Sequence, residues 1–561
     1  MATPGTSPPA ARMSYSSGQG SGQPASKFSK KDQFIFRHGS RLHAYARDKV
    51  PYPISYDRDV FDLQCMDHLL MLKAKRTVSF IDFKGNTPKR CLDLGTGLGD
   101  WVIDAAKYWP DCTFVGYDLV NVQLPLSLCV EPDIANRIEW VHGNLLRQKL
   151  PFDEDEFDYV HIHGLAFAVP ENKWPTVYEE VNRVLKPGGA VEQIEEDAIF
   201  PTVPRWFTQP LHSQTKRPSA LFPDGTQRSL ATPPSVSTRH PHDHALLEHL
   251  FVSVFSSRFL NRTPTSLLPT YFSTVFRHVL SPPTLIFPMP PLAPLPPLPA
   301  ELGSPTSTSS ELSESSTLYM PDLDLDPAQT SPGEQAVQIF YVNHYQKPNG
   351  EDTNPPDGRG RSASTSTAST LSTLNESVLI SSTPYKTRPP STPHRRSVAF
   401  SAPDMSTRIG NDAVLELFPI DELTSFEEHS LSMQLYRAVG NVLAVREAMW
   451  DELIDQTMND RAALDGFGWE HDDDVFVNRQ KFDALVERYK GDMHVRISLW
   501  NSATQYGWPY PRRDPLTKAE LVEEERLRRA ILEGRKRAVD EDFQQPSRSL
   551  RLLVGMKSFD D

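Results

Sequence analysis

Three glycines, spaced two residues apart, follow a short apolar run at residues 90–101, RCLDLGTGLGDW. The apolar run, the glycines and the amphipathic stretch after them predict a strand, a tight loop and a helix N-terminus. Glycine lets a ligand approach the backbone closely, and the free N–H groups at a helix N-terminus favour polar or anionic groups. The stretch therefore predicts a ligand cradle at the end of a strand, within an α/β fold.

Strand and helix signals alternate through residues 88–200. Strands are predicted at RCLDLG, TFVGYDL, IEWVHGN, FDYVHIHG and AVEQIEE, and helices at GDWVIDAAKYW and WPTVYEEVNRVLK. A further helix is predicted over about 57–75 from the spacing of its apolar residues. Strands and helices that alternate in this way indicate βαβ units, so we expect an α/β fold with a parallel sheet and helices on both faces.

The remaining residues divide by composition, because the chain has 50 prolines and several stretches without apolar periodicity. Residues 1–32, and the Ser/Thr/Pro-rich residues 301–410, are expected to be disordered. Residues 204–240 are interpreted as a loop insertion. Amphipathic patterns predict helices at 243–260, 266–280, 425–456 and 516–537, the last with a capping box at Thr517 and Glu520, and a strand at 494–508.

We therefore expect one α/β domain interrupted by long disordered insertions. Residues 33–300 would form its first part. Residues 411–512 would complete it with a helical segment and the last strand, and residues 513–561 would form a C-terminal helix and tail. A separate second domain is the alternative, but 411–510 has few strand signals for one.

Charge and cysteine content make several classes of protein poor candidates. The chain has 58 basic and 72 acidic residues, a net charge of −14, and a polyanion binds nucleic acid poorly because phosphate neutralisation drives that binding. The four cysteines show no CxxC spacing, so we expect reduced thiols and no metal site. No breaker-free apolar stretch approaches about 20 residues. We expect a soluble intracellular protein, cytoplasmic or nuclear, with neither a membrane nor a nucleic-acid partner.

The glycine spacing distinguishes two classes of cofactor. Gly95, Gly97 and Gly99 form G-x-G-x-G, whereas a dinucleotide fingerprint is G-x-G-x-x-G. Asp100 stands at the third position of that fingerprint, where its charge would face a pyrophosphate. Asp93 suits a cationic amino group, and S-adenosylmethionine carries an ammonium group and no phosphate. The pattern favours S-adenosylmethionine over NAD.

A carboxylate is predicted to bind the cofactor's ribose. Asp118 ends the second strand, about 20 residues beyond the glycine loop, where a carboxylate can accept hydrogen bonds from both ribose hydroxyls. Both cofactor classes use such a residue, so it indicates an adenosine ligand in general. The alternative is that Asp118 caps the next helix.

Three segments together resemble the class I S-adenosylmethionine-dependent methyltransferases. They are LDLGTGLGDWVIDAAKYWPDCTFVGYDL, LPFDEDEFDYVHIH and VNRVLKPGGAVEQIEE. Within that superfamily they are most similar to the LaeA-like (UMTA-type) fungal methyltransferases. The resemblance covers residues 50–200 and extends loosely to the later helices. It implies a Rossmann-like methyltransferase sheet and S-adenosylmethionine as the cofactor.

The resemblance also implies roles for individual residues. The three glycines would line the methionine portion of the cofactor with Asp93 beside them, and Asp118 would bind the ribose. Asn144 stands where the family usually has the Asp that binds the adenine amino group, and its side-chain oxygen can still accept that bond. The expected cofactor-binding residues are Asp93, Gly95, Thr96, Gly97, Gly99, Asp118, Leu119, Asn144 and Leu145.

Methyl transfer from a sulfonium depends mainly on positioning, and a base is needed only when the nucleophile loses a proton. His163 and His161, at the end of the fourth strand, are the candidate catalytic residues, with His163 nearer the strand's carboxyl end. The alternative is that both are histidines with ordinary structural partners. The resemblance places Glu192 near the substrate mouth. Tyr52 and Tyr56 are expected either in a lid over the cofactor or, as the alternative, as aromatics that pack in the core or in a loop.

We expect an active methyltransferase whose acceptor is a small molecule. The alternative is a LaeA-like regulator that binds the cofactor but acts through protein partners. The proline tract 290–299, PPLAPLPPLP, could bind such a partner through an SH3-type groove, or could serve as a stiff spacer. A third possibility, an NAD-dependent oxidoreductase, is disfavoured by the glycine spacing.

Overall fold

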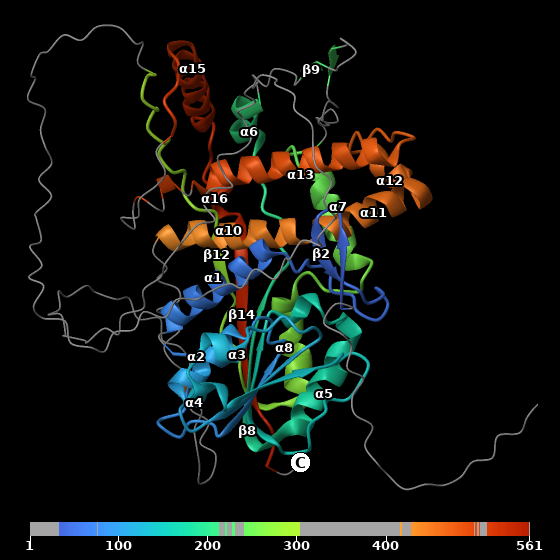
Figure 1. The fold of residues 1–561 in the computed structure, drawn as a ribbon, viewed down its shortest axis with the longest axis vertical. Helices are drawn as coiled ribbons and strands as arrows, with labels where there is room; N and C mark the ends of the chain where they lie inside the picture. Colours follow the sequence, from blue (N-terminus) through green and yellow to red (C-terminus); the bar gives the residue numbers. More distant parts are fainter. Residues whose placement is uncertain are drawn as a thin grey trace, which may run out of the picture.

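A mixed eight-stranded sheet is the centre of the described structure (Figure 1). The computed structural model of the 561-residue chain describes residues 33–75, 77–212, 219–221, 227–229, 240–302, 416–417, 428–498, 500–501, 504 and 513–559. Strands follow the order β11-β14-β8-β7-β4-β5-β6, and β12 also pairs with β14. The predicted tail 1–32, and nearly all of the predicted insertion 301–410, lie outside the described residues.

The five predicted parallel strands form the middle and one side of this sheet. They are β4 (Arg90–Leu94), β5 (Thr113–Asp118), β6 (Ile138–His142), β7 (Phe157–His163) and β8 (Leu185–Glu196). Most of their residues are buried on both faces, as parallel strands covered by helices require. The predicted α/β fold with a parallel sheet is confirmed.

The strand that completes the sheet was predicted in the wrong place. Strand β14 (Pro546–Met556) runs antiparallel to β8 and pairs on its other side with β11 (Arg277–Leu280) and β12 (Leu285–Pro288). It lies within residues 513–561, which were expected to form only a helix and tail. The tail is therefore an interior strand of the sheet.

The strand expected at 494–508 is wrong over 494–497, which belong to helix α13 (Val475–Ile497), and residues 499, 502–503 and 505–508 of that prediction lie outside the described residues. Tyr489, Met493 and Ile497 recur every four residues and are all buried, so the segment packs with helical periodicity. The prediction at 266–280 was also too long. Helix α8 (Pro264–Val275) ends before Phe276, and the residues after it pair with β14 as β11.

Helices cover both faces of the sheet. On one face lie α1 (Arg58–Lys75) and α2 (Asp100–Tyr108), and on the other α5 (Trp174–Val184) and α8. Short helices α3 (Leu126–Cys129) and α4 (Pro132–Ala135) follow β5. The two faces have separate hydrophobic cores, to which β4, β5 and β7 contribute alternate residues.

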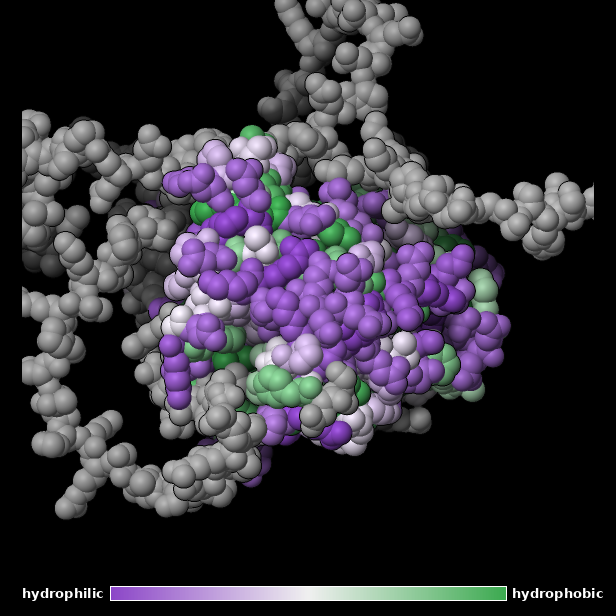
Figure 2. All heavy atoms as spheres, turned by 90° about the horizontal axis from the view of Figure 1, so that it is seen from below, coloured by the Kyte–Doolittle hydropathy of each residue, from purple (hydrophilic) through white to green (hydrophobic). Residues whose placement is uncertain are grey.

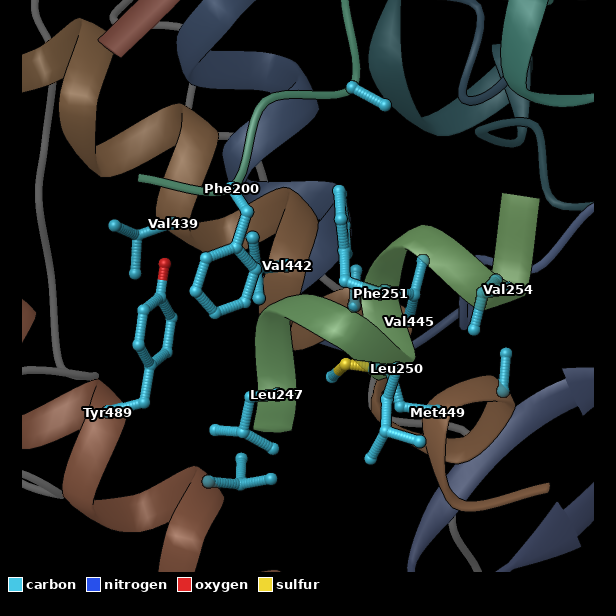
Figure 3. Close-up of a cluster of buried hydrophobic side chains, with 14 of the residues drawn as sticks. Phe200, Leu247, Leu250, Phe251, Val254, Val439, Val442, Val445, Met449 and Tyr489 are labelled. Carbon is cyan, nitrogen blue, oxygen red and sulfur yellow. The ribbon is translucent and has the colours of Figure 1, made fainter. Parts of the chain in front are cut away.

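A third layer of helices lies across one end of the sheet, at the top of Figure 1. It contains α7 (Ala245–Ser256), α10 (Glu428–Ala444), α11 (Arg446–Asn459) and α13. Figure 3 shows Leu250 and Phe251 of α7 against Val442 and Met449 of α10 and α11. The helices on either side of residues 301–410 therefore share one core.

The helix predicted over 425–456 is two helices in the structure. Val445 separates α10 from α11, with φ −96° and ψ 13°. The Ala444 carbonyl accepts a hydrogen bond of 2.9 Å from the N–H of Ser55, in the segment before α1. In a continuous helix this carbonyl would instead accept a hydrogen bond from an N–H group of the next helical turn.

Smaller elements surround these layers. They are β1 (Phe34–Arg37), β2 (Ser40–His43), β3 (Ile81–Asp82), η2 (Leu165–Phe167), η3 (Glu171–Lys173), α6 (Arg205–His212), β9 (Ser219–Leu221), β10 (Gln227–Ser229), β13 (Glu416–Leu417), α12 (Ala462–Asp465), α15 (Lys518–Arg535) and α16 (Glu541–Gln544). The interpretation of 204–240 as a loop is wrong for α6, where Phe207 and Thr208 are buried. The capping box predicted at Thr517 and Glu520 is present at the start of α15.

The proline tract packs on the chain's own helices. The Pro296 carbonyl accepts a hydrogen bond from Arg528 (2.5 Å), and the Ala293 carbonyl accepts one from Arg535 (2.6 Å), both from α15. Seen from below, the described surface is mostly hydrophilic, with hydrophobic residues in small separate groups (Figure 2). Among the described helices, none combines the length and the apolar character needed to cross a membrane.

Candidate active site

The glycine loop turns at the carboxyl end of β4, where backbone hydrogen bonds hold it. The N–H groups of Gly95 and Thr96 donate to the Tyr117 carbonyl at 2.8 and 3.0 Å. Gly95 and Gly97 have φ angles of +85° and +55°, a region that glycine enters without steric cost. The loop therefore reverses direction sharply just before α2 begins.

Gly97 and Gly99 have different surroundings. A Cβ atom added at Gly97 would have one neighbour within 4 Å, the Gln64 Oε1 atom at 3.7 Å, so this position borders open space. A Cβ atom at Gly99 would lie 2.4 Å from the Trp140 ring. Gly99 thus allows β6 to pack closely against the loop, and it does not line the cavity. This corrects its predicted role beside the cofactor.

A cavity of about 220 Å³ opens above the loop. The loop, the segment before α1, helix α1 itself, the ends of β5 and β7, and helix α10 form its wall. It is lined by ten of the eleven predicted site residues: Asp93, Gly95, Thr96, Gly97, Asp118, Leu119, Asn144, Leu145, His161 and His163. Ten residues that are spread from position 93 to position 163 of the sequence therefore lie around one cavity.

Asp118 connects the end of β5 to the glycine loop. Its Oδ2 atom accepts a hydrogen bond from the Gly97 N–H at 2.8 Å, and its Oδ1 atom accepts one from the Val120 N–H at 3.2 Å. Burial raises the pKa of Asp118 to about 6, although these hydrogen bonds favour its ionised form. Neither amide begins a helix, so the alternative of a helix cap is wrong.

Asn144 already has two partners in the chain. Its Nδ2 group donates to the Lys49 carbonyl at 3.1 Å, and its Oδ1 atom accepts from the Leu146 N–H at 2.9 Å. It therefore fastens the segment before α1 across the cavity. An amide oxygen has two lone pairs, so Oδ1 can accept one further bond from a ligand.

His161 is fixed beneath α2. Its Nδ1 atom lies 2.7 Å from Asp93 Oδ1, and its ring stacks on Trp101 with centroids 4.1 Å apart and planes at 6°. If Asp93 is ionised it can only accept, which places the proton on Nδ1 and a lone pair on Nε2. Nε2 is buried and has no hydrogen-bond partner among the described residues.

His163 reaches the cavity from the last residue of β7 and is more accessible. Its side chain is 27% exposed, and Nε2 lies 3.9 Å from Asp67 Oδ2 on α1. Burial opposes ionisation of Asp67, but Arg548 and Arg437 outweigh it and hold the pKa of Asp67 below its usual range. An ionised carboxylate therefore faces His163 and would stabilise a protonated imidazole.

Three other residues were expected near the site, and only the two tyrosines line the cavity. Tyr52 and Tyr56 line the cavity, in the segment before α1, as expected of a cover over the site. Glu192 is not at the substrate mouth. It is fully buried, and its Oε2 atom accepts hydrogen bonds from the Ser79 hydroxyl (2.6 Å) and the Phe80 N–H (2.8 Å).

The sequence did not predict the charged wall of the cavity. Asp67, Glu196 and Arg437 line the cavity there and come from α1, the end of β8 and α10. Nothing in the local sequence marks these three residues as parts of one site. No group of three or more His, Cys, Asp or Glu side chains in the described part of the chain could hold a metal ion.

Comparison with known proteins identifies the region around the loop. Residues 91–189 match the family described as "Methyltransferase domain". "Secondary metabolism regulator laeA" of Aspergillus flavus is 30% identical over 199 residues, which are 34% of this chain and 50% of that protein. "Protein-methionine methyltransferase laeA" of Emericella nidulans is 28% identical over 169 residues, 30% of this chain and 42% of that protein.

The chain thus spans about half the length of the curated relatives that it matches. Among solved structures, human N-acetylserotonin methyltransferase in complex with SAM is similar over 40% of this chain and 52% of that one, with 15% identity and a TM-score of 0.23.

Proposed function

Because the chain contains a class I S-adenosylmethionine-dependent methyltransferase domain and resembles the LaeA-like proteins, we propose that it transfers the methyl group of S-adenosylmethionine to a small-molecule acceptor. One observation carries the proposal. The Gly97 position is open to the cavity, while its N–H is bonded to Asp118, so space for a ligand and a ribose-binding carboxylate lie side by side.

The lining residues fit the parts of this cofactor. Asp93, Gly95, Thr96 and Gly97 would hold the methionine portion, Asp118 and Leu119 the ribose, and Asn144 and Leu145 the adenine. The glycine loop offers backbone N–H groups and no bulky side chain. Asp118 offers a carboxylate to the ribose hydroxyls, which would stabilise its ionised form by charge-assisted hydrogen bonds.

The bound cofactor would supply a methyl group on a sulfonium, ready for in-line displacement. His163 is the better-placed general base, because it borders the cavity and faces ionised Asp67. It would take the proton of an acceptor hydroxyl or amine while that atom attacks the methyl group and the C–S bonding pair returns to sulfur. His161 is held by Asp93 and Trp101, so we assign it a positioning role.

Two measurements test this proposal. Calorimetric titration should detect binding of S-adenosylhomocysteine and no comparable binding of NAD. Incubation with labelled S-adenosylmethionine and a filtered cell extract should then place the label in the low-molecular-mass fraction. A Gly97→Ala variant is the matched negative control, because its side chain would enter the ligand space. Binding of NAD in preference to S-adenosylhomocysteine would overturn the assignment.

A second candidate function is a regulator that acts on or through proteins. It is favoured by the names of two relatives, a secondary metabolism regulator and a protein-methionine methyltransferase. Methionine has no proton to lose, so its methylation would need no base. The proline tract adds little support, because α15 already binds its carbonyls. Label in the protein fraction of the same extract, recovered on methionine after digestion, would favour this function.

A further inference from the structure

One wall of the cavity belongs to an ionic cluster built from four elements, in which Asp67, Glu196 and Arg437 line the cavity and Arg548 lies behind them. Asp67 comes from α1, Glu196 from the end of β8, Arg437 from α10 and Arg548 from β14. The side chains of Asp67, Glu196 and Arg548 are at most 6% exposed, and that of Arg437 is 13% exposed. Two carboxylates and two guanidinium groups therefore face one another away from water.

Arg548 uses four of its five N–H donors in hydrogen bonds. Its Nε donates to Glu196 (2.6 Å), and its terminal nitrogens donate to both oxygens of Asp67 (2.6 and 2.8 Å) and to Gln434 (2.7 Å). Glu196 accepts a further bond from Asn441 at 2.9 Å. These bonds leave the two carboxylates well supplied with donors, and Arg548 fixes their positions.

Arg437 is different, because most of its donors are unused. Among the described residues it makes one hydrogen bond, a long one of 3.3 Å from a terminal nitrogen to Glu196. Its Nε is buried without a hydrogen-bond partner and lies 3.7 Å from Asp67 Oδ2. A guanidinium group has five N–H donors, and a buried donor left unsatisfied costs free energy. Because Nε is buried, the spare N–H capacity of this wall lies on the terminal nitrogens of Arg437.

The position of Arg437 indicates what would use that capacity. It lines the same cavity as His163, and Asp67 lies close to both, 3.7 Å from Arg437 and 3.9 Å from His163. With the cofactor over the loop, the acceptor would lie between His163 and this wall. Oxygen atoms pair with a guanidinium group, and a carboxylate pairs most strongly because the bonds are charge-assisted and can be bidentate.

We propose that Arg437 binds a carboxylate of the methyl acceptor, so that the enzyme takes acidic small molecules as substrates. This rests on the proposed methyltransferase function, and it names the substrate class of that same site. A cationic group of the acceptor is disfavoured at this wall, because the carboxylates of the wall are already engaged by arginine and asparagine donors. Arg437 follows the 301–410 segment in the chain, so the wall is completed only when α10 packs on the sheet.

The test uses three probes of one shape and different charge. Wild-type full-length protein, saturated with S-adenosylhomocysteine, is titrated calorimetrically with benzoate, benzamide and benzylamine. Benzoate should bind at least tenfold more tightly than either of the others. Acetate against acetamide repeats the comparison with a smaller probe. The proposal is overturned if the neutral or cationic member of the pairs binds as tightly as the carboxylate.

Variants of the protein test whether the preference for benzoate comes from Arg437. Arg437→Gln should abolish the preference for benzoate, and Arg437→Lys, which keeps the charge, should retain part of it. Arg551→Gln is the control, because Arg551 lies in β14, bonds to Ser281 and Thr284, and does not line the cavity. It should behave as wild type. A carboxylate preference that survives in Arg437→Gln would assign it to another residue.

Arg437 could bind either the carboxylate of the acceptor or that of the cofactor, and the affinity for S-adenosylhomocysteine distinguishes the two. If Arg437 holds the acceptor, both variants at this position keep that affinity within about twofold. A loss of tenfold or more would show that Arg437 holds the cofactor's own carboxylate, and would overturn the proposal. Failure of the wild type to bind S-adenosylhomocysteine at all would instead overturn the proposed function, which keeps the two failures distinguishable.

Discussion

At the scale of single residues, the environment of Asp118 has a direct consequence for ligand binding. Burial raises its pKa from 3.8 to about 6, against the hydrogen bonds from Gly97 and Val120 that favour the ionised form. A raised pKa in the folded state contributes stability below about pH 4 that is lost as the pH rises through about 6. At neutral pH the ionised Asp118 therefore destabilises the empty protein, and ligand hydroxyls that bond to it would offset this cost.

This sign leads to a pH-dependent affinity. Ribose hydroxyls stabilise the ionised form, so the dissociation constant of S-adenosylhomocysteine should be flat above about pH 6 and rise up to tenfold per pH unit below it. Asp118→Asn should bind about 10- to 100-fold more weakly at pH 8, since a hydrogen bond to a charged group contributes about 1.5–3 kcal/mol. Its profile should be flat between pH 5 and 8. Calorimetric titration with S-adenosylhomocysteine across this pH range checks the prediction. If the affinity of the wild type and that of Asp118→Asn depend on pH in the same way, Asp118 does not bind the ribose.

The two histidines should respond oppositely to the same substitution. His163→Gln should lower kcat about 10²- to 10⁴-fold with little change in cofactor affinity, because it removes the proposed base. His161→Gln should instead lower the free energy of unfolding by about 1–3 kcal/mol, because Asp93 loses its buried partner. Labelled methyl transfer and thermal unfolding on both variants check this. Equal activity loss in the two would leave no reason to prefer His163.

At the scale of elements, the glycine loop combines a ligand surface with a packing contact. Gly97→Ala places a methyl group in the cavity at φ +55°, and should weaken S-adenosylhomocysteine binding at least tenfold with about 1 kcal/mol lost in stability. Gly99→Ala places its methyl group 2.4 Å from Trp140 at φ +88°, and should cost about 2–4 kcal/mol of stability. Thermal melts and binding isotherms of both variants measure the two effects separately. A Gly99→Ala protein as stable as wild type would contradict the packing role.

Elements set by local sequence were predictable, whereas those set by distant partners were not. The β4–loop–α2–β5 unit and the capping box of α15 follow from patterns within a few residues, and both are present. Strand β14 is held by pairing with β8 and β12, which are distant in the sequence, and its segment was therefore predicted to be a tail. The break at Val445 depends on a bond from Ser55. Most of the candidate site could be read from the glycine loop, but Arg437 could not, because α10 reaches the cavity only through tertiary packing.

At the scale of the whole molecule, the two ends of the chain are interdependent. Strand β14 is an interior strand, paired on one side with β8 and on the other with β11 and β12. Its Arg548 is buried and bonds to Asp67 of α1 and Glu196 of β8. The last residues of the chain therefore support both the sheet and the wall of the cavity. The segment 301–410, by contrast, is rich in Ser, Thr and Pro and lies almost wholly outside the described residues.

Two deletions should separate these contributions. Removal of residues 305–405 should leave cooperative thermal unfolding and S-adenosylhomocysteine affinity close to wild type, because low-complexity sequence contributes little to a core and loop-closure entropy changes slowly with length.

Truncation after Gln545 should abolish cooperative unfolding. It exposes the edge of β8 and leaves Asp67 and Glu196 buried without Arg548, where breaking a buried ion pair costs about 3–5 kcal/mol of a total stability of about 5–15 kcal/mol. Calorimetric melts of both deletion proteins measure the cooperativity of unfolding. Arg548→Met is the control, because it removes the ion pairs of Arg548 and keeps the strand. A truncated protein that melts cooperatively would show that β14 is dispensable, and loss of cooperativity in the internal deletion would show that residues 305–405 contribute to the fold.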